Sequence, residues 1–292
     1  MSSRKEEYSN INMGSLGDKK VVCLTLDVEQ DYGDLLDEPS YEGLEHIPEV
    51  VAFFREKNIP LTCFVQGSLL ETHPAFIEQM STLDIEFELH SYSHPSPKKR
   101  NIEFEVGKGK EAYREFFGED PLGYRAPLGV IDGRDYEILA SHGFKFDSSI
   151  SPSIRPGTFN NMAKPTKICL VNKFKIIEFP FTVFHSMIRI PLAISYIKLL
   201  GRPFFYLLKI LPLPNLIIFG FHLHDLFGLS SANKLSLEKF SPVYRLVFSR
   251  IYIRQSNDGL AILDEIVALF QERGYVFCRI DDIYKSIANT IR

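Results

Sequence analysis

The 292-residue chain contains no tryptophan and no long block of like charge. It also lacks an uncharged apolar stretch of about 18 residues, the length that a membrane-spanning helix needs. The net charge is -4, and no basic segment or RNA-binding motif is present, which argues against nucleic acid as a partner. With 24 Phe and 13 Tyr residues and 45% hydrophobic residues, the composition is that of an ordinary globular protein.

Cysteine is scarce, and its four copies form no CxxC pair. Cys23, Cys63, Cys169 and Cys278 each lie in an apolar, strand-like stretch. That pattern is typical of buried, reduced thiols in a non-oxidising compartment. Residues 1–20 are polar and contain no apolar core of a secretory signal. We therefore predict a disordered lead-in over residues 1–19, one domain over residues 20–292 and a cytoplasmic location.

Short apolar runs alternate with amphipathic segments along the chain. The alternation is typical of βαβ units in a parallel sheet, and seven or eight units favour a closed or nearly closed (β/α) barrel. The predicted strands are residues 21–26, 61–65, 85–89, 122–124, 144–147, 176–179, 216–222 and 275–280. The predicted helices are residues 47–57, 74–80, 103–117, 132–142 and 259–273.

The segment from residue 188 to 221 is strongly apolar, although four basic residues and four prolines interrupt it. We interpret it as a core helix, a loop and a buried strand. The alternative is an apolar lip that contacts a membrane surface peripherally and grips a lipid-linked molecule.

Polar residues that could hold a metal ion follow two of the predicted strands. His90 and His94 are four residues apart, so on a helical turn both imidazoles would reach one ion. Asp27 and Glu29 are two residues apart, and alternate residues of a strand point to one side. Glu29, His90 and His94 could supply three ligands to Zn²⁺, or to Fe, Co or Ni. Asp27 would then lie beside a bound water as a general base.

Further candidates lie at the carboxyl ends of other predicted strands, where active sites form in parallel α/β folds. Arg125 lies in a turn with Pro and Gly, and it could pair with Asp27 and keep that carboxylate ionised. His224 could protonate a leaving amine, whereas we interpret His222 as a structural side chain. Asp147 could orient His224 or only cap its own loop.

The order of these motifs resembles that of the polysaccharide deacetylases, the carbohydrate esterase group with the NodB homology domain. The family motifs T-F-D-D, H-[ST]-x-x-H, R-x-P-x-G and L-x-L-H correspond here to residues 25–29, 90–94, 125–129 and 221–224. Each motif alone is a weak signal, but four in the right order are specific. The resemblance implies a distorted (β/α) barrel and a metal-dependent deacetylation of an acetylated sugar.

Carried onto this chain, the resemblance implies a role for each matching residue. Asp27 corresponds to the catalytic base, and Arg125 to the residue that holds this base. His90 and His94 correspond to metal ligands. His224 corresponds to the catalytic acid.

The chain departs from the family pattern at Val28, which stands where a second aspartate usually follows the first. The D-V-E order resembles a branch with peptidoglycan-deacetylase-like and allantoinase-like members. In that branch the third position can bind the metal, which supports Glu29 as a ligand. Residues 146–149 are similar to the "YDSS" of the same branch, and Leu128 replaces a frequent tyrosine.

Three functions remain open from the sequence. The leading hypothesis is a cytoplasmic deacetylase of an N-acetylated sugar that is polymeric, lipid-linked or nucleotide-linked. The second is a hydrolase of another amide, such as a cyclic amide or a formylated amino sugar. The third is a non-catalytic relative that binds a sugar or a lipid.

Overall fold

The computed structural model describes residues 7–33, 35–96, 99–155, 159–235, 237–239, 242–254 and 258–288. Its main sheet is built around parallel strands. In spatial order these are Leu216–His222 (β11), Val21–Val28 (β2), Leu61–Val65 (β3), Ile85–Leu89 (β4), Gly123–Tyr124 (β5), Phe146–Asp147 (β6) and Ile176–Glu178 (β10). The predicted α/β fold is confirmed, with the strands curved into an incompletely closed barrel.

Three further strands join the sheet, and one small hairpin lies apart from it. Val276–Phe277 (β12) runs parallel to β2, whereas Cys169–Val171 (β9) pairs antiparallel with β10. Tyr8–Asn10 (β1) pairs antiparallel with β9. Ile154–Arg155 (β7) and Phe159–Asn160 (β8) form the hairpin.

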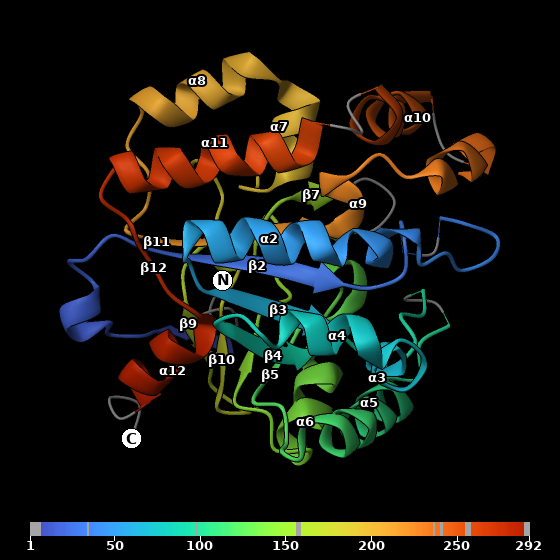
Figure 1. The fold of residues 1–292 in the computed structure, drawn as a ribbon. Helices are drawn as coiled ribbons and strands as arrows, with labels where there is room; N and C mark the ends of the chain where they lie inside the picture. The colour runs from blue at the N-terminus through green and yellow to red at the C-terminus, as the bar shows by residue number, and fades with distance from the viewer. Residues whose placement is uncertain are drawn as a thin grey trace.

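Helices cover the outside of the sheet, from α11 at the top of Figure 1 through α2 and α4 to α5 and α6 at the bottom. The α-helices are Ile47–Lys57 (α2), Gly67–Thr72 (α3), Pro74–Met80 (α4), Ile102–Phe117 (α5), Gly133–Ser141 (α6), Ile194–Leu200 (α7), Arg202–Ile210 (α8), Leu223–Leu226 (α9), Pro242–Phe248 (α10), Gly259–Glu272 (α11) and Ile280–Ala288 (α12). Short 3₁₀ turns occupy Gly14–Leu16, Glu42–His46, Pro127–Gly129, Ser230–Lys234 and Leu237–Lys239, and a π-helical turn (η6) occupies Ser249–Arg254.

Strand β2 shows why the central strands are continuous apolar runs in the sequence. All eight of its residues are buried. Val22 and Leu24 pack outward against the helices, whereas Val21 and Cys23 pack inward beside α12. A parallel strand that is covered on both faces loses the alternation of polar and apolar residues that a half-exposed strand shows.

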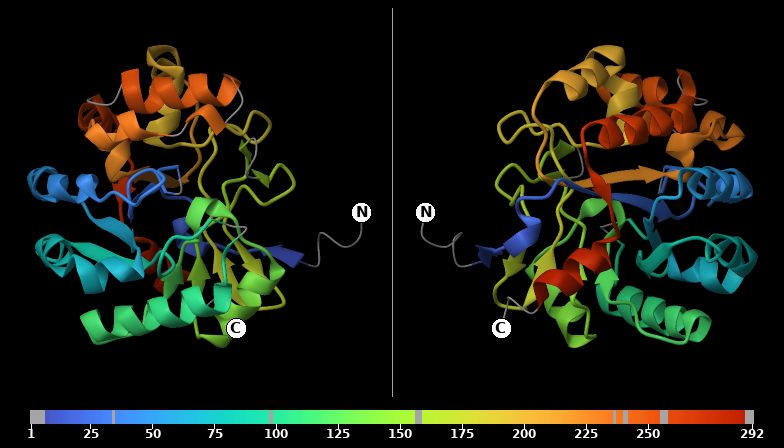
Figure 2. Two further views of the ribbon diagram at one scale, coloured as in Figure 1. Left: turned by 90° about the vertical axis from the view of Figure 1, so that its right-hand side faces the viewer. Right: turned by 60° about the vertical axis from the view of Figure 1, so that its left-hand side comes forward.

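The barrel is plugged at one end and incompletely closed on one side. Ile280, Ile283 and Ile287 of α12 pack against inward-facing residues near the amino ends of the strands. Between β10 and β11, an extended segment takes the place of direct strand pairing: Thr182 donates its N–H to the carbonyl of Ile218 at 3.1 Å. The opposite end, where the carboxyl ends of the strands lie, faces the viewer in the left view of Figure 2.

The amino-terminal region differs from the expected disordered lead-in. Tyr8–Asn10 forms β1, and Ser9 Oγ donates a 2.6 Å hydrogen bond to Asn172 Oδ1. Lys164 Nζ donates to the Tyr8 hydroxyl at 2.8 Å. These long-range partners order a segment whose local composition is polar. Residues 1–6 of the predicted lead-in lie outside the described residues.

The apolar segment over residues 188–221 folds as α7, α8 and β11. Strand β11 is largely buried and α7 buries one face, as the core interpretation predicts, but a second helix, α8, stands in place of the expected loop and exposes Tyr206 and Ile210. No helix in the described part of the chain is long and apolar enough to cross a bilayer.

Candidate active site

The predicted metal ligands meet at the carboxyl ends of β2 and β4. Glu29 Oε2 lies 2.8 Å from Nε2 of His90 and 2.7 Å from Nε2 of His94. All three side chains are buried, and their ligand atoms lie within 4.8 Å of one another. Burial alone would raise the pKa of Glu29, but the charge and hydrogen bonds of the two histidines hold it well below its usual range.

The spacing of the two histidines suggested a shared helical turn, but the structure has none at this place. Residues 90–96 form a loop in which Ser91 and His94 have positive φ angles of 63° and 54°. Left-handed backbone is costly for residues other than glycine, so the surrounding contacts must maintain it. The sequence analysis thus predicted correctly that His90 and His94 lie together, but the helical turn from which it argued is absent.

The side chain of Glu105, on α5, maintains this loop. It accepts hydrogen bonds from the backbone N–H groups of Tyr92 and Ser93, at 3.0 and 2.8 Å, and from the hydroxyls of Ser91 and Ser93, at 2.6 and 2.7 Å. Sequence analysis missed this buried carboxylate, because no local pattern connects a helix residue to a loop more than ten positions earlier.

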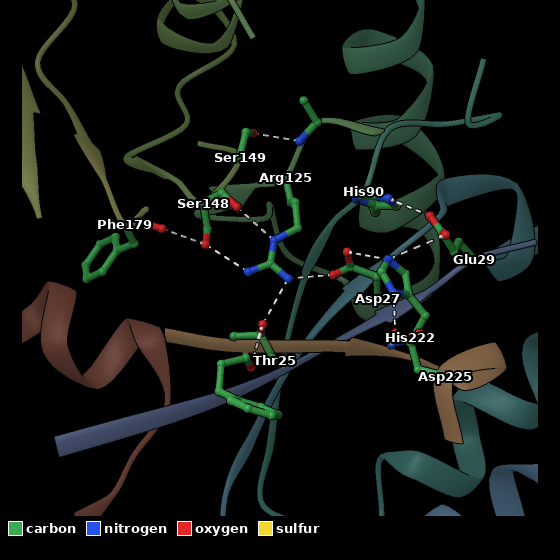
Figure 3. A network of polar contacts seen from close by, with 12 residues as sticks. Thr25, Asp27, Glu29, His90, Arg125, Ser148, Ser149, Phe179, His222 and Asp225 are labelled. Atoms are coloured by element: carbon green, nitrogen blue, oxygen red, sulfur yellow. Dashed lines mark hydrogen bonds and ion pairs between the residues drawn. The ribbon is translucent and has the colours of Figure 1, made fainter. Parts of the chain in front are cut away.

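Asp27 is held by Arg125, as predicted. Arg125 Nη1 donates to Asp27 Oδ1 at 2.6 Å and to Thr25 Oγ1 at 3.0 Å. Its other nitrogens donate to the carbonyl and hydroxyl of Ser148, both at 2.8 Å (Figure 3). The guanidinium lies between two aromatic rings, 4.0 Å from Phe64 and 4.4 Å from Phe181. These contacts fix Oδ1 of Asp27 and leave Oδ2 facing the cluster of Glu29 and the histidines.

His222 is closer to the carboxylates than His224. Strand pairing sets His222 opposite Asp27, and its Nε2 lies 3.5 Å from Asp27 Oδ2 and 3.8 Å from Glu29 Oε1. Asp225 Oδ2 contacts its Nδ1 at 2.9 Å (Figure 3). Burial would lower the pKa of His222, but the bond to Asp225 and the nearby carboxylates raise it to about 9. We interpreted this residue as structural, and the sequence analysis did not single out Asp225.

His224 lies behind His222. The two rings stack with centroids 4.7 Å apart, and His224 Nδ1 accepts the N–H of Tyr32 at 3.2 Å. Burial and the neighbouring His222 lower the pKa of His224 to about 4. This environment favours a neutral ring, which is a weaker proton donor than an imidazolium.

Asp147 caps its own loop. Its oxygens accept from the N–H and hydroxyl of Ser149 at 3.0 and 2.6 Å. Its other close polar neighbour is Glu178, and burial raises the pKa of both carboxyls, Glu178 well above its usual range. Of the two roles considered for Asp147, the structure supports the loop cap, and Asp225 performs the orienting role on His222.

A cavity of about 420 Å³ opens over these residues, and Asp27, Glu29, His90, His94, His222 and His224 lie at its floor. Acidic and imidazole groups therefore gather at the carboxyl ends of the strands. This is the edge at which α/β barrel proteins place their active sites.

Comparison with known proteins finds that part of the chain is similar to one family. Residues 15–146 match the family model of polysaccharide deacetylases. Over 124 residues the chain is 28% identical to a peptidoglycan deacetylase of Helicobacter pylori, covering 41% of this chain and 42% of that protein. Over 99 residues it is 29% identical to chitin deacetylase 1 of Cryptococcus neoformans, covering 33% of this chain and 21% of that protein. The resemblance to the polysaccharide deacetylase family is confirmed, although these matches span less than half of either relative.

Solved structures extend the similarity in fold to nearly the whole chain. A candidate polysaccharide deacetylase from Mycobacterium smegmatis superposes with a TM-score of 0.61 at 18% identity, covering 97% of this chain and 94% of that one. A family 4 carbohydrate esterase pseudoenzyme from Bacillus anthracis superposes with a TM-score of 0.52 at 15% identity, covering 91% and 66%. The fold is therefore shared by a protein named as a candidate deacetylase and by one named as a pseudoenzyme.

Proposed function

We propose that this protein is a metal-dependent hydrolase that removes the acetyl group from an N-acetylated sugar. The observation that carries the proposal is the convergence of Glu29, His90 and His94 on one point beside Asp27. The pseudoenzyme of similar fold makes a non-catalytic role the main competitor, but here the whole set of candidate ligands and the paired aspartate are present.

The donor set fits a divalent cation. One carboxylate and two imidazoles are ligands that Zn²⁺ favours, and Fe, Co or Ni would also bind them. The Nε2 atoms of both histidines are directed at a single oxygen of Glu29, so the three side chains converge on one point. When bound, the ion would lower the pKa of a coordinated water and polarise the amide carbonyl.

The residues around the ligands divide the proton transfers. Asp27 accepts the proton of the attacking water through Oδ2, since Arg125 occupies Oδ1. His222 donates a proton to the leaving amine, because its Nε2 faces the site and Asp225 fixes its Nδ1. We had expected His224 in this role; its position behind His222 suits a supporting contact instead.

A matched pair of variants separates the two histidines. His222→Gln is expected to lower kcat by about 10²–10⁴-fold, the range for a lost general acid, and His224→Gln by much less. Steady-state rates on an N-acetylated sugar, with thermal unfolding to verify the fold, measure this. A larger loss in His224→Gln would return the acid role to His224.

A second candidate function is hydrolysis of another amide, such as a cyclic amide or a formylated amino sugar. The same water could attack any amide carbonyl. Residues 27–29 have the D-V-E order, which resembles a branch of the family whose members catalyse such reactions. We favour the sugar because the two curated relatives are named as deacetylases of peptidoglycan and chitin. The cytoplasmic location is part of the proposal, and the four unpaired cysteines support it.

The test is product analysis on a panel of acetylated sugars, formylated amino sugars and ureides, with and without a chelator. We expect acetate release from an acetylated sugar, lost with chelator and restored by Zn²⁺. His90→Ala and His94→Ala should each lower the bound metal measured by elemental analysis. Release that persists without metal, or a chain that stays metal-free in metal-replete medium, would contradict the proposal.

A further inference from the structure

The cavity above the site continues into an apolar chamber. Its walls come from the β7–β8 hairpin, α7, α10 and η6, all of which follow β6 in the chain. They include Ile154, Pro191, Leu199, Val243, Phe248 and Ile251. Sugar hydroxyls buried against such side chains would lose hydrogen bonds to water without replacement, which is costly. A sugar polymer is therefore a poor occupant for this part of the cavity, and a hydrocarbon chain is a good one.

Arg155 contributes a cation to the chamber wall. Arg155, on β7, is partly buried, its guanidinium is hydrogen-bonded to Tyr244, and the side chains of Tyr196 and Tyr252 also lie close enough to affect its pKa. In the described residues, no carboxylate lies within ion-pair distance of it. A guanidinium against apolar walls gains most from an anion, and its planar fork matches a phosphate.

The rim of the chamber is apolar and faces solvent. Ile154 and Val243 line the cavity, yet they are 52% and 72% exposed, and Leu246, one turn further along α10, is 63% exposed. Exposed apolar side chains that gather at one place on a surface mark a site of contact with an apolar partner. The chamber thus offers an apolar chain a continuous path from outside to the site.

We propose that the substrate is an amphiphile in which the acetylated sugar is joined through a phosphate to a hydrocarbon chain. The sugar lies on the floor beside Asp27, the phosphate pairs with Arg155, and the chain fills the chamber and leaves between Ile154 and Val243. This proposal rests on the proposed function for the reacting end of the molecule. It departs from the polymers that the names of the curated relatives indicate.

Binding of three simple probes tests the chamber without any turnover. Octyl phosphate, butyl phosphate and octyl glucoside are titrated into the protein by calorimetry, below the concentrations at which they form micelles. We expect octyl phosphate to bind at least about tenfold more tightly than butyl phosphate, because it buries four more methylene groups. It should also bind about tenfold more tightly than octyl glucoside, which lacks the charge.

Variants assign these preferences to residues. Arg155→Leu should weaken the binding of octyl phosphate about tenfold and leave the binding of octyl glucoside unchanged. Arg155→Lys should retain part of the preference for octyl phosphate. Arg134→Leu removes an exposed arginine on α6, at the opposite side of the molecule in Figure 1, and should bind all probes as the wild type does. Thermal unfolding establishes that each variant is folded.

Turnover of matched substrates separates this proposal from the proposed function. The probes are N-acetylglucosamine as its octyl phosphodiester, its octyl glycoside and its methyl glycoside. We expect kcat/KM to be highest for the phosphodiester, lower for the octyl glycoside and lowest for the methyl glycoside. Hydrolysis without chain or phosphate preference, or equal binding of octyl phosphate by wild type and Arg155→Leu, would overturn the amphiphile and leave the deacetylase. Selective binding with no hydrolysis of any probe would overturn the deacetylase and leave the chamber as an amphiphile site.

Discussion

Two pairs of acidic residues in the same barrel have opposite electrostatic environments. Asp27 on β2 and Glu88 on β4 lie at the same level, since both pair in register with Phe64 of β3. Asp27 and Glu29 face cations and imidazoles: Arg125 for one, His90 and His94 for the other.

Glu86 and Glu88 face each other. Burial is the main cause that raises the pKa of both carboxyls, to about 7 for Glu86, and nearby acidic groups add to it. Their oxygens accept from Thr62 Oγ1 and the N–H of Gly123, and the charged neighbours that affect their pKa values, Asp281 among them, are acidic. Burial raises the pKa of Glu29, Glu86 and Glu88 alike, so the comparison teaches that the imidazole partners of Glu29 reverse the shift that burial alone produces.

The largest expected effect is a loss of turnover when Asp27, of the pair Asp27 and Glu29, is replaced. Asp27→Asn removes the proposed base, and turnover should fall by about 10²–10⁴-fold or more. Bound metal should be retained, because the substituted amide would leave Glu29 and both histidines in place. Rates and elemental analysis measure the two effects.

Glu88→Gln is the matched control at the same level of the barrel. The neutral amide resembles the protonated acid, so turnover should stay close to that of the wild type. Normal turnover in Asp27→Asn, or an equal loss in both variants, would remove the distinction between the two pairs.

The next effect is on stability. Arg125→Met leaves Asp27 buried without its cation, which should cost about 3–5 kcal/mol of unfolding free energy in urea. Adding Asp27→Asn to this variant should restore part of the loss, because the unpaired charge is then removed. Arg134→Met, at an exposed position, is the control and should change stability by no more than about 0.5 kcal/mol. A double variant as unstable as the sum of the single ones would show that Arg125 acts through packing between the phenyl rings alone.

The smallest effect is a pH dependence from Glu86. Its pKa is raised in the folded protein, so between about 4.5 and about 7 the folded state binds more protons than the unfolded state. The unfolding free energy should therefore fall as the pH rises through this window, on the order of 1–3 kcal/mol. Glu86→Gln should reduce this fall, whereas Glu137→Gln, an exposed carboxyl, should retain it. Urea unfolding at a series of pH values measures both, and identical slopes in the two variants would show that Glu86 is already charged.

The sequence predicted most of the strands because the central strands are largely buried and therefore stand out as apolar runs. Strands β3 and β4 match the predicted ranges, and β2 extends the predicted one by two residues. The carboxyl-terminal region was predicted less well: residues 275–280 form only the short β12, and α12 begins at Ile280. An apolar stretch of six residues has the same hydrophobicity whether it enters a sheet or begins a helix, so periodicity could not separate the two.

The site residues were predicted only in part. Asp27, Glu29, His90, His94 and Arg125 stand in short motifs at strand ends, and the structure brings all five together. His222 and His224 lie two residues apart at the end of one strand, and the sequence motif pointed to His224 as the acid. Only the pairing of β11 with β2 sets His222 opposite Asp27.

By itself the sequence determined the parallel α/β architecture and the candidate site residues, since apolar runs and short motifs are local properties. The tertiary structure decided which histidine faces the carboxylates, how Glu105 folds the loop from His90 to His94, and which carboxyls meet a cation. It also decided that the hairpin, α7, α10 and η6 enclose an apolar chamber beside Arg155. Each of these depends on contacts between residues far apart in the chain, and no local pattern contains them.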